Sequence, residues 1–297
     1  MDNQELVNIG TEEVSWRDYL VLCKPKVVVV MLITAAVGMF LAVQEIPPIS
    51  NVILGLIGIG MAAGSAAAVN HIMDRKIDEK MARTKRRPLP QGKLSPLQAL
   101  LFAAALGVSG IAILVFWVNA LTAWLTVAAL MGYAVVYTVW LKRATPQNIV
   151  IGGIAGAAPP LLGWTAVTGS IEPNALLLVL IIFAWTPPHF WALCIARKED
   201  YAKAGIPMLP VTHGVPYTRL QILLYSLLMV ATTLFPVMTG MSGAFYLLLV
   251  LALNVKFLYR VTCLWTEPGE SPMLLFKYSI NYIMLLFVAL LVDHYMV

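Results

Sequence analysis

Two aspartates and an asparagine at four-residue spacing are the side chains most suited to holding a metal ion. Asn70, Asp74 and Asp78 follow an apolar run, and a helix that continued through them would place all three on one face. Side chains one turn apart lie about 5–6 Å from each other between Cβ atoms, which a dication can bridge. Magnesium prefers oxygen ligands and is commonly held by one or two carboxylates while substrate phosphates complete its shell. The spacing therefore predicts a Mg²⁺ site, although the same spacing also arises by chance.

A basic run follows these residues and points to an anionic ligand. Arg83, Lys85, Arg86 and Arg87 lie within ten residues of Asp78. They could neutralise a diphosphate, arginine through paired donors and lysine as a point charge. Farnesyl diphosphate combines such a head with a tail that dissolves in a bilayer. An ordinary basic cytoplasmic loop is the alternative interpretation.

A second charged patch lies four predicted helices later. The stretch 197–204 contains Lys198, Asp200 and Lys203. Its place after a similar apolar run suggests a pseudo-repeat whose two halves, near 70–90 and 197–210, converge on one cavity. Transporters use comparable repeats, and a solvated loop is the alternative.

Histidines and proline pairs mark further candidate positions. His189 lies in an otherwise apolar run, where a polar ring is costly and functional by default, and His71 adjoins Asn70. Heme iron is most often held by histidine, so both are candidate heme ligands, with a hydrogen-bonded structural role as the alternative. The pairs 159–160 and 187–188 remove backbone donors and predict a kink or break in their helices.

The composition places these residues in a membrane protein. Hydrophobic residues make up 60% and charged residues 12% of the 297 residues, whereas soluble domains carry roughly 25% charged residues. Continuous apolar runs favour helices over a barrel. We expect an all-α bundle of about nine transmembrane helices, at 27–43, 52–68, 99–118, 121–141, 149–167, 175–196, 220–239, 244–258 and 274–292. Glycines crowd the second and fifth runs, so those two spans are expected to be central.

Charge distribution predicts the orientation. All 20 lysines and arginines fall in segments that nine crossings would place on one face, which the positive-inside rule makes cytoplasmic. The amino terminus is then cytoplasmic and the carboxyl terminus lies on the opposite side. Residues 1–23 form a short surface tail without the apolar core of a signal peptide, and 24–297 form one polytopic domain. The net charge of +5 indicates topology and contact with membrane lipids, not nucleic-acid binding.

Several segments resemble a known family. Asn70 to Asp78, followed by 81–89, resembles the first aspartate-rich motif of the UbiA superfamily of intramembrane prenyltransferases. The segments 137–143, 145–153, 156–164, 185–191 and 200–210 resemble the branch of that superfamily that farnesylates protoheme IX. Together they cover nearly the whole chain in the expected order.

The resemblance implies a fold, a reaction and site residues. It implies a central cavity capped on the cytoplasmic side, in a bacterial inner membrane protein. The reaction transfers farnesyl from its diphosphate to a vinyl group of heme b and adds water, giving heme O for terminal oxidases. By position, Asn70, Asp74 and Asp78 would hold Mg²⁺ and diphosphate, and Arg83, Arg87 and Lys142 the phosphates.

The second motif departs from the superfamily pattern. Many members repeat the aspartate, whereas Asp200 is followed four residues later by Ala204. Asp200 remains a candidate ligand for metal and diphosphate. Whether a second metal site exists stays undecided at this point, and Lys198 or Lys203 could contact phosphate directly.

The expected chemistry is ionisation of the carbon–oxygen bond, aided by magnesium and cationic side chains. Aromatic faces attract cations, so Tyr137 or Tyr133 could stabilise the allylic cation, with an interfacial tyrosine belt as the alternative. Two other functions stay open. One is prenylation of a quinone precursor or chlorophyll-like acceptor; the other is a transporter or a heme-carrying assembly factor. A downstream heme-modifying enzyme or oxidase is a possible partner.

Overall fold

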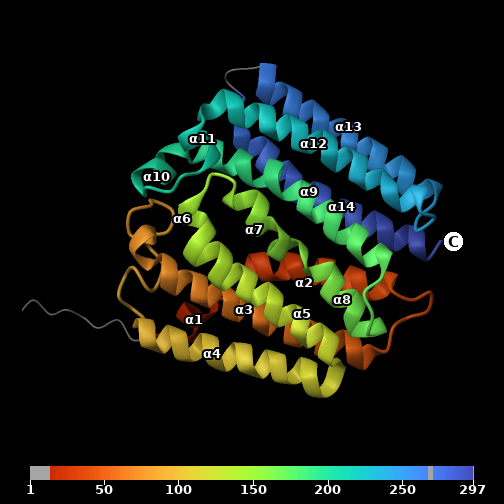
Figure 1. Cartoon of the computed structure of the whole chain (residues 1–297), viewed down its shortest axis with the longest axis horizontal. Helices are drawn as coiled ribbons and strands as arrows, with labels where there is room; N and C mark the ends of the chain where they lie inside the picture. Colours follow the sequence, from red (N-terminus) through yellow and green to blue (C-terminus); the bar gives the residue numbers. More distant parts are fainter. Residues whose placement is uncertain (1–13, 267–269, 297) are drawn as a thin grey trace, which may run out of the picture.

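The computed structural model describes residues 14–266 and 270–296, and every regular element within them is helical. The helices lie side by side in a bundle (Figure 1). The α-helices are α1 Trp16–Leu22, α2 Pro25–Leu41, α3 Ile49–Asp78, α4 Pro96–Ile113, α5 Ala120–Met131, α6 Lys142–Ala144, α7 Asn148–Ala157, α8 Pro159–Thr168, α9 Pro173–Ala196, α10 Lys198–Lys203, α11 Leu209–Thr212, α12 Gly214–Met238, α13 Ala244–Thr266 and α14 Pro272–His294. Two π-helices, η1 Leu114–Val118 and η2 Gly132–Leu141, continue α4 and α5.

Eight helical segments in these ranges are long and apolar enough to cross a membrane. A ninth is counted if α1 and α2, which meet at a bend of 55°, form one span. This agrees with the expected number of about nine. Apolar side chains such as Phe116, Trp124 and Leu248 point outward, as expected for helices surrounded by lipid.

The two glycine-rich spans are central, as predicted. α3 and the α7–α8 segment are the two most buried of the eight candidate spans. A Cβ atom on Gly163 would collide with the carbonyl of Ala35, and one on Gly38 with that of Pro160, so α2 and α8 meet backbone to backbone. Small residues allow such close approach in membranes. Gly156 is the exception among the predicted glycines, because it is exposed with nothing near its Cβ position.

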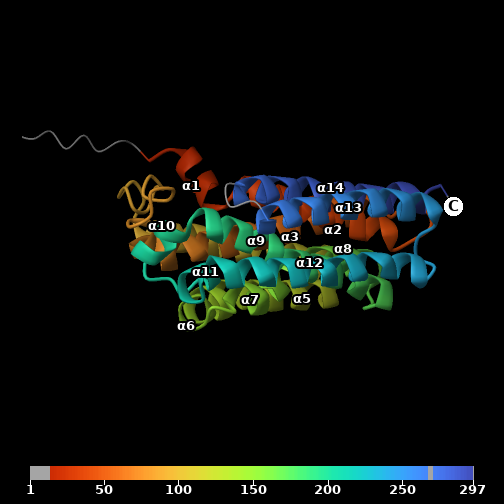
Figure 2. The same cartoon turned by 90° about the horizontal axis from the view of Figure 1, so that it is seen from above.

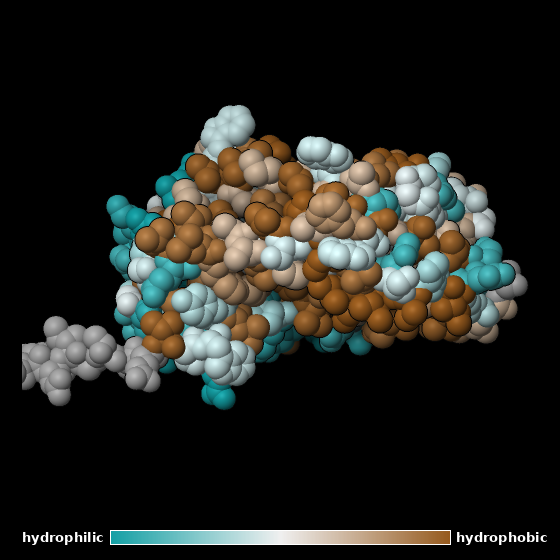
Figure 3. All heavy atoms as spheres, turned by 90° about the horizontal axis from the view of Figure 1, so that it is seen from below, coloured by the Kyte–Doolittle hydropathy of each residue, from teal (hydrophilic) through white to brown (hydrophobic). Residues whose placement is uncertain are grey.

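Polar segments gather at the ends of the bundle. The segment after α3 lies with α6 and α10 at one end, and the carboxyl terminus lies at the other (Figures 1 and 2). In the space-filling view apolar side chains cover most of the middle of one face, with hydrophilic side chains mainly toward the ends (Figure 3). The basic residues of the segment after α3, of α6 and of α10 therefore lie at the same end of the bundle.

Two details differ from the sequence-based expectation. α1 occupies part of the predicted tail, whose residues 1–13 lie outside the described residues. α13 extends to Thr266, beyond the expected end at 258, so Arg260 lies within a helix instead of a loop. Lys256 keeps its ammonium group over the Tyr278 ring at 5.2 Å.

The proline pairs behave differently from each other. Pro159 and Pro160 open α8 directly after α7, which confirms a break there. Pro187 and Pro188 lie inside α9, which continues to Ala196. The prediction of a helix break at this second pair is therefore wrong. Membrane helices tolerate proline where neighbouring helices support them, and α9 packs against α7, α12 and α14.

Candidate active site

The end of α3 carries the three predicted ligands side by side. Asn70, Asp74 and Asp78 are all buried on this 30-residue helix. Asn70 Nδ2 donates to Asp74 Oδ2 at 3.0 Å. The helix therefore continues past its apolar run and places the three on one face, as the spacing predicts.

Each of these three side chains is paired with a cation. Lys142 Nζ lies 2.6 Å from Asp74 Oδ2, and Arg87 Nη1 lies 2.7 Å from Asp78 Oδ2. Lys24 Nζ donates to Asn70 Oδ1 at 2.5 Å. The carboxylates are about 5% exposed or less, and buried charges must be paired in this way. The site therefore combines buried carboxylates with cationic side chains in direct contact with them.

Lys24 is a site residue that the sequence analysis missed. It lies at the bend between α1 and α2 with φ +50°, a left-handed conformation that is strained for a residue other than glycine. Its ammonium also donates to the Tyr133 hydroxyl at 3.2 Å. A lysine directly before Pro25, at the start of the first span, was the available signal, because proline restricts the residue before it.

The π-helix η2 supplies the aromatic wall of the site. Tyr133 and Tyr137 stack within it, with ring centroids 5.7 Å apart, and Thr138 Oγ1 accepts from Asn70 Nδ2 at 3.1 Å. η2 as a whole packs against α3. π-helical turns are rare and often occur at functional sites. Both predicted tyrosines therefore lie beside the carboxylate helix.

Gly152 on α7 makes room for the Tyr137 ring. A Cβ atom on Gly152 would overlap that ring, so the absence of a side chain fixes where the ring can lie. Gly153, next to it, faces Thr186 and Phe183 of α9. The glycines of α7 thus let η2 and α9 approach from two sides.

The second charged patch lies near the first. Tyr201 of α10 is buried, and burial raises the pKa of its phenol, with a further rise from Cys194 and a decrease from the Arg83 guanidinium. α10 and the segment after α3 lie at the same end of the bundle (Figure 1). The convergence of the two patches on one cavity stays a prediction.

The remaining predicted phosphate ligands are less enclosed. Arg83, Lys85, Arg86 and Lys203 are exposed, while Lys198 and Asp200 are half-buried. Among the residues described, no hydrogen bond or ion pair joins Lys198, Asp200 or Lys203 to the carboxylates of α3. Arg87 and Lys142 therefore contact the carboxylates, and Lys24 contacts the Asn70 amide.

A divalent cation fits the donor set at α3. Asp74 Oδ1 is buried and has no hydrogen-bond partner, which leaves an anionic oxygen free for a ligand. No group of three His, Cys, Asp or Glu side chains that could hold a metal occurs in the part of the chain described. Asp74 and Asp78 with the Asn70 amide match Mg²⁺, which is held by one or two carboxylates when phosphates complete its shell.

The two predicted heme ligands lie in different surroundings. His71 is buried, with neither ring nitrogen hydrogen-bonded, and it interacts electrostatically with Lys24, Arg87 and Arg83. His189 lies on α9 between the rings of Trp185 and Phe276. The first is thus placed among the cations of the site and the second among aromatic rings.

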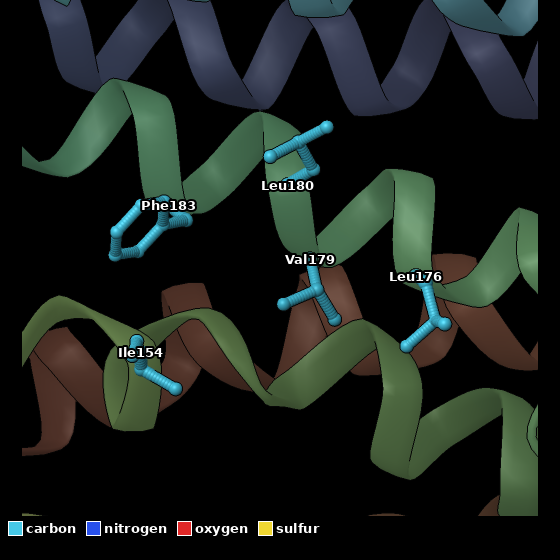
Figure 4. A pocket seen from close by; sticks show the side chains of 5 residues that line it. All are labelled: Ile154, Leu176, Val179, Leu180 and Phe183. Atoms are coloured by element: carbon cyan, nitrogen blue, oxygen red, sulfur yellow. The ribbon is translucent and has the colours of Figure 1, made fainter.

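An apolar recess of about 280 Å³ lies between α7 and α9. Ile154, Leu176, Val179, Leu180 and Phe183 line it (Figure 4). Phe183 also lies near Gly153, whose neighbour Gly152 faces the Tyr137 ring, so the recess begins close to the tyrosine wall. It contains no charged side chain and suits hydrocarbon.

Known sequences resemble this chain over nearly its whole length. The model of the UbiA prenyltransferase family matches residues 31–290. A protoheme IX farnesyltransferase of Saccharophagus degradans is 59% identical over 294 residues, which are 98% of this chain and 97% of that protein. One of Marinobacter nauticus is 61% identical over 283 residues, 95% and 94% of the two chains.

Solved structures share the fold. A structure of digeranylgeranylglyceryl phosphate synthase superposes with a TM-score of 0.79 at 21% identity, covering 95% of this chain and 99% of that one. A UbiA homolog from Archaeoglobus fulgidus, bound to DMAPP and Mg²⁺, gives a TM-score of 0.72 at 18% identity, covering 94% and 99%. The arrangement of helices is therefore that of intramembrane UbiA proteins.

Proposed function

The chain belongs to the UbiA prenyltransferase family and, within it, to the protoheme IX farnesyltransferases, and we propose that it makes heme O at the α3 site. In this reaction the C1–O bond of farnesyl diphosphate breaks and the diphosphate leaves with the electron pair. Farnesyl C1 bonds to the terminal carbon of a heme b vinyl group, and water adds to the other vinyl carbon and loses a proton.

One observation carries the assignment of the site: acidic and basic side chains alternate in direct contact at the end of α3. Asp74 touches Lys142, and Asp78 touches Arg87. Carboxylates alone would repel a diphosphate, and cations alone would not hold a metal. The combination suits a metal diphosphate, because each component finds groups of opposite charge.

The proposed magnesium ligands are Asn70, Asp74 and Asp78. Bound there with the diphosphate, Mg²⁺ would supply Lewis-acid stabilisation of the leaving group. The A. fulgidus homolog is bound to both DMAPP and Mg²⁺, which supports this choice. Asp200 remains a candidate for further contact with metal or phosphate from α10.

The cations of this chain would bind the leaving group. Arg87 and Lys142, which contact Asp78 and Asp74, would turn to the phosphate oxygens when those carboxylates take a metal. Arg83, Lys85, Lys198 and Lys203 would contribute from the rim, where salt screens their charge more strongly. Preorganised positive charge at the leaving group lowers the barrier to ionisation.

Tyr137 would shelter the allylic cation. Its ring stacks on Tyr133 and packs on the backbone of Gly152, which limits where it can move. Aromatic faces attract cations most strongly where water is excluded. The recess between α7 and α9 has the apolar lining that a farnesyl chain needs.

The location and orientation of the protein are inferred from its fold and its charge distribution. The protein is an integral membrane protein; we assign it to the bacterial inner membrane, with its amino terminus and the α3 site on the cytoplasmic side. Residues 24–297 would form one domain whose two halves converge on the site. Heme b and farnesyl diphosphate are its substrates, and an oxidase or a heme-modifying enzyme would take the product.

The experiment that tests this function is an assay of heme O formation in membranes with farnesyl diphosphate. Asp74→Asn should lower the rate about 100-fold or more, the range lost with one transition-state contact in other enzymes. Glu79→Gln is the matched control, because Glu79 directly follows α3 and is exposed. Full activity of the Asp74 variant, or transfer to a quinone precursor in preference to heme, would contradict the proposal.

A further inference from the structure

The membrane histidine His189 is fixed by α14. His189 Nδ1 lies 2.6 Å from Ser279 Oγ, and Ser279 Oγ donates to the carbonyl oxygen of Phe276 at 2.7 Å. The serine is fully buried, whereas the histidine keeps part of its surface uncovered. A single serine thus sets the orientation of an imidazole that comes from another helix.

The hydrogen-bond chain also determines which ring nitrogen carries the proton. A hydroxyl has one hydrogen to donate, and Ser279 gives it to the Phe276 carbonyl. Ser279 Oγ then accepts from His189 Nδ1–H, so that two hydrogen bonds form. With the other tautomer Ser279 would donate to Nδ1 and the bond to Phe276 would be lost. The arrangement with two bonds is the more stable one, and it leaves a lone pair on Nε2.

Aromatic rings hold the imidazole on both faces. The Trp185 ring stacks on His189 at 4.2 Å and the Phe276 ring at 4.6 Å, with interplanar angles of 17° and 23°. Trp185 Nε1 donates to the carbonyl oxygen of Ser279 at 2.8 Å. Ser279 therefore fixes both the histidine and one of the rings that flank it.

The edge of the imidazole is the part that remains available. Within the described ranges no hydrogen bond to Nε2 occurs. Burying a polar ring in a membrane helix costs free energy, and such residues usually mark a functional site. A lone-pair nitrogen with a fixed tautomer is the form in which histidine binds a metal ion, and the partner on the other nitrogen tunes that bond.

We propose that Ser279 and Trp185 are positioning residues that present His189 Nε2 as an axial ligand to the iron of the heme substrate. The inference rests on the proposed function, because that function brings heme to this chain. The macrocycle would stand across the edges of the three stacked rings, and coordination would fix the position of its vinyl groups. His71 lies among cations instead and has no partner that would fix its tautomer.

Hemin titration of the purified full-length protein in nanodiscs tests this inference without farnesyl diphosphate. The Soret band and the electron paramagnetic resonance spectrum report the axial ligand. Ser279→Ala should weaken hemin binding about tenfold or more, the loss typical for a partner of a ligating histidine. Ser279→Thr keeps the hydroxyl and should bind as the wild type does. Ser226→Ala is the matched control, because Ser226 is buried in α12 and donates to Ile222 without contacting a histidine.

A cavity variant separates ligation from packing. His189→Gly should lose the spectrum of histidine-bound heme, and added imidazole should restore it. His213→Gln, at the exposed start of α12, should leave the spectrum unchanged. An unchanged spectrum and affinity in the His189 variant would overturn the inference, as would unchanged affinity in Ser279→Ala.

The diphosphate site provides a readout that distinguishes this failure from failure of the proposed function. Mn²⁺ binding with inorganic diphosphate should be lost in Asp74→Asn and retained in His189→Gly. Heme O formation with unaltered hemin binding in His189→Gly would refute the axial ligand and leave the farnesyltransferase intact. A wild-type protein that forms no heme O would instead refute the function itself.

Discussion

Lys142 Nζ lies 2.6 Å from Asp74 Oδ2, and the Lys142 side chain is 12% exposed. The two residues are 68 positions apart and come from α6 and α3, so the contact depends on the packing of two spans. An ammonium group therefore neutralises the carboxylate from which a metal ligand is expected. A metal bound through Oδ1, which has no hydrogen-bond partner, would compete with the lysine on Oδ2 for the charge of one carboxylate, and a diphosphate that accepted the lysine would relieve this competition.

The first prediction concerns this competition. Lys142→Gln should increase the affinity for Mn²⁺ without diphosphate about tenfold, because it removes a unit charge close to the metal ligand. The same variant should form heme O more slowly, because the leaving group loses a cation. Mn²⁺ binding followed by paramagnetic resonance and the transfer assay measure the two effects.

Arg143→Gln is the control for Lys142. Arg143 is exposed and reaches only the backbone carbonyl of Met73, at 3.4 Å. Its replacement should change neither the Mn²⁺ affinity nor the rate of heme O formation by more than about twofold, as expected for a screened surface charge. If the Lys142 variant bound Mn²⁺ more weakly than the wild type, lysine and metal would not be competitors.

The second prediction concerns Gly152. Gly152→Ala should displace the Tyr137 ring, because the added methyl group overlaps it. Displacement of a group by about 1 Å can reduce a rate about 100-fold, so we expect a lower kcat with little change in the binding of Mn²⁺ and diphosphate. Steady-state kinetics and the binding assay separate the two.

Gly156→Ala tests the same substitution one turn further along α7. Nothing lies within 4 Å of its Cβ position, and alanine is favoured over glycine in a helix by about 1 kcal/mol. This variant should be fully active and at least as stable as the wild type. Equal activity of both variants would mean that the position of Tyr137 does not limit the reaction.

The sequence was sufficient for the carboxylate helix but not for its partners. Asn70, Asp74 and Asp78 could be predicted because helical periodicity relates neighbours on one element. Lys24 could not, because its contact with Asn70 spans 46 residues and requires the bend between α1 and α2. The contact between Lys142 and Asp74 likewise appears only when the spans are packed.

Local geometry was harder to predict than the number of spans. The π-helix at Tyr133 and Tyr137 has no distinctive residue pattern, since it depends on hydrogen bonds shifted by one residue. The continuity of α9 through Pro187 and Pro188 depends on the helices around it. Ser279 carried no signal in the sequence, because a serine among apolar residues is common and only its contact with His189 gives it a role.

The third prediction concerns stability at the end of the bundle opposite the site. Asp293 near the end of α14 accepts from the backbone nitrogens of Gly243 at 2.6 Å and Tyr246 at 2.9 Å. Its buried carboxylate therefore caps the start of α13, where negative charge is also favoured by the helix dipole. Asp293→Ala should lower the free energy of unfolding by about 1–3 kcal/mol, the usual effect of leaving buried donors unpaired.

Thermal unfolding in detergent measures the loss. Heme O formation per folded molecule should stay unchanged because the carboxyl-terminal end of α14 and the segment after α3 lie at opposite ends of the bundle (Figure 1). Glu172→Gln is the control, since Glu172 accepts only from the exposed Ser170 hydroxyl. It should alter unfolding by less than about 0.5 kcal/mol. A variant of Asp293 that unfolds like the wild type but has lost activity would show that this carboxylate acts on the site and not on the helix end.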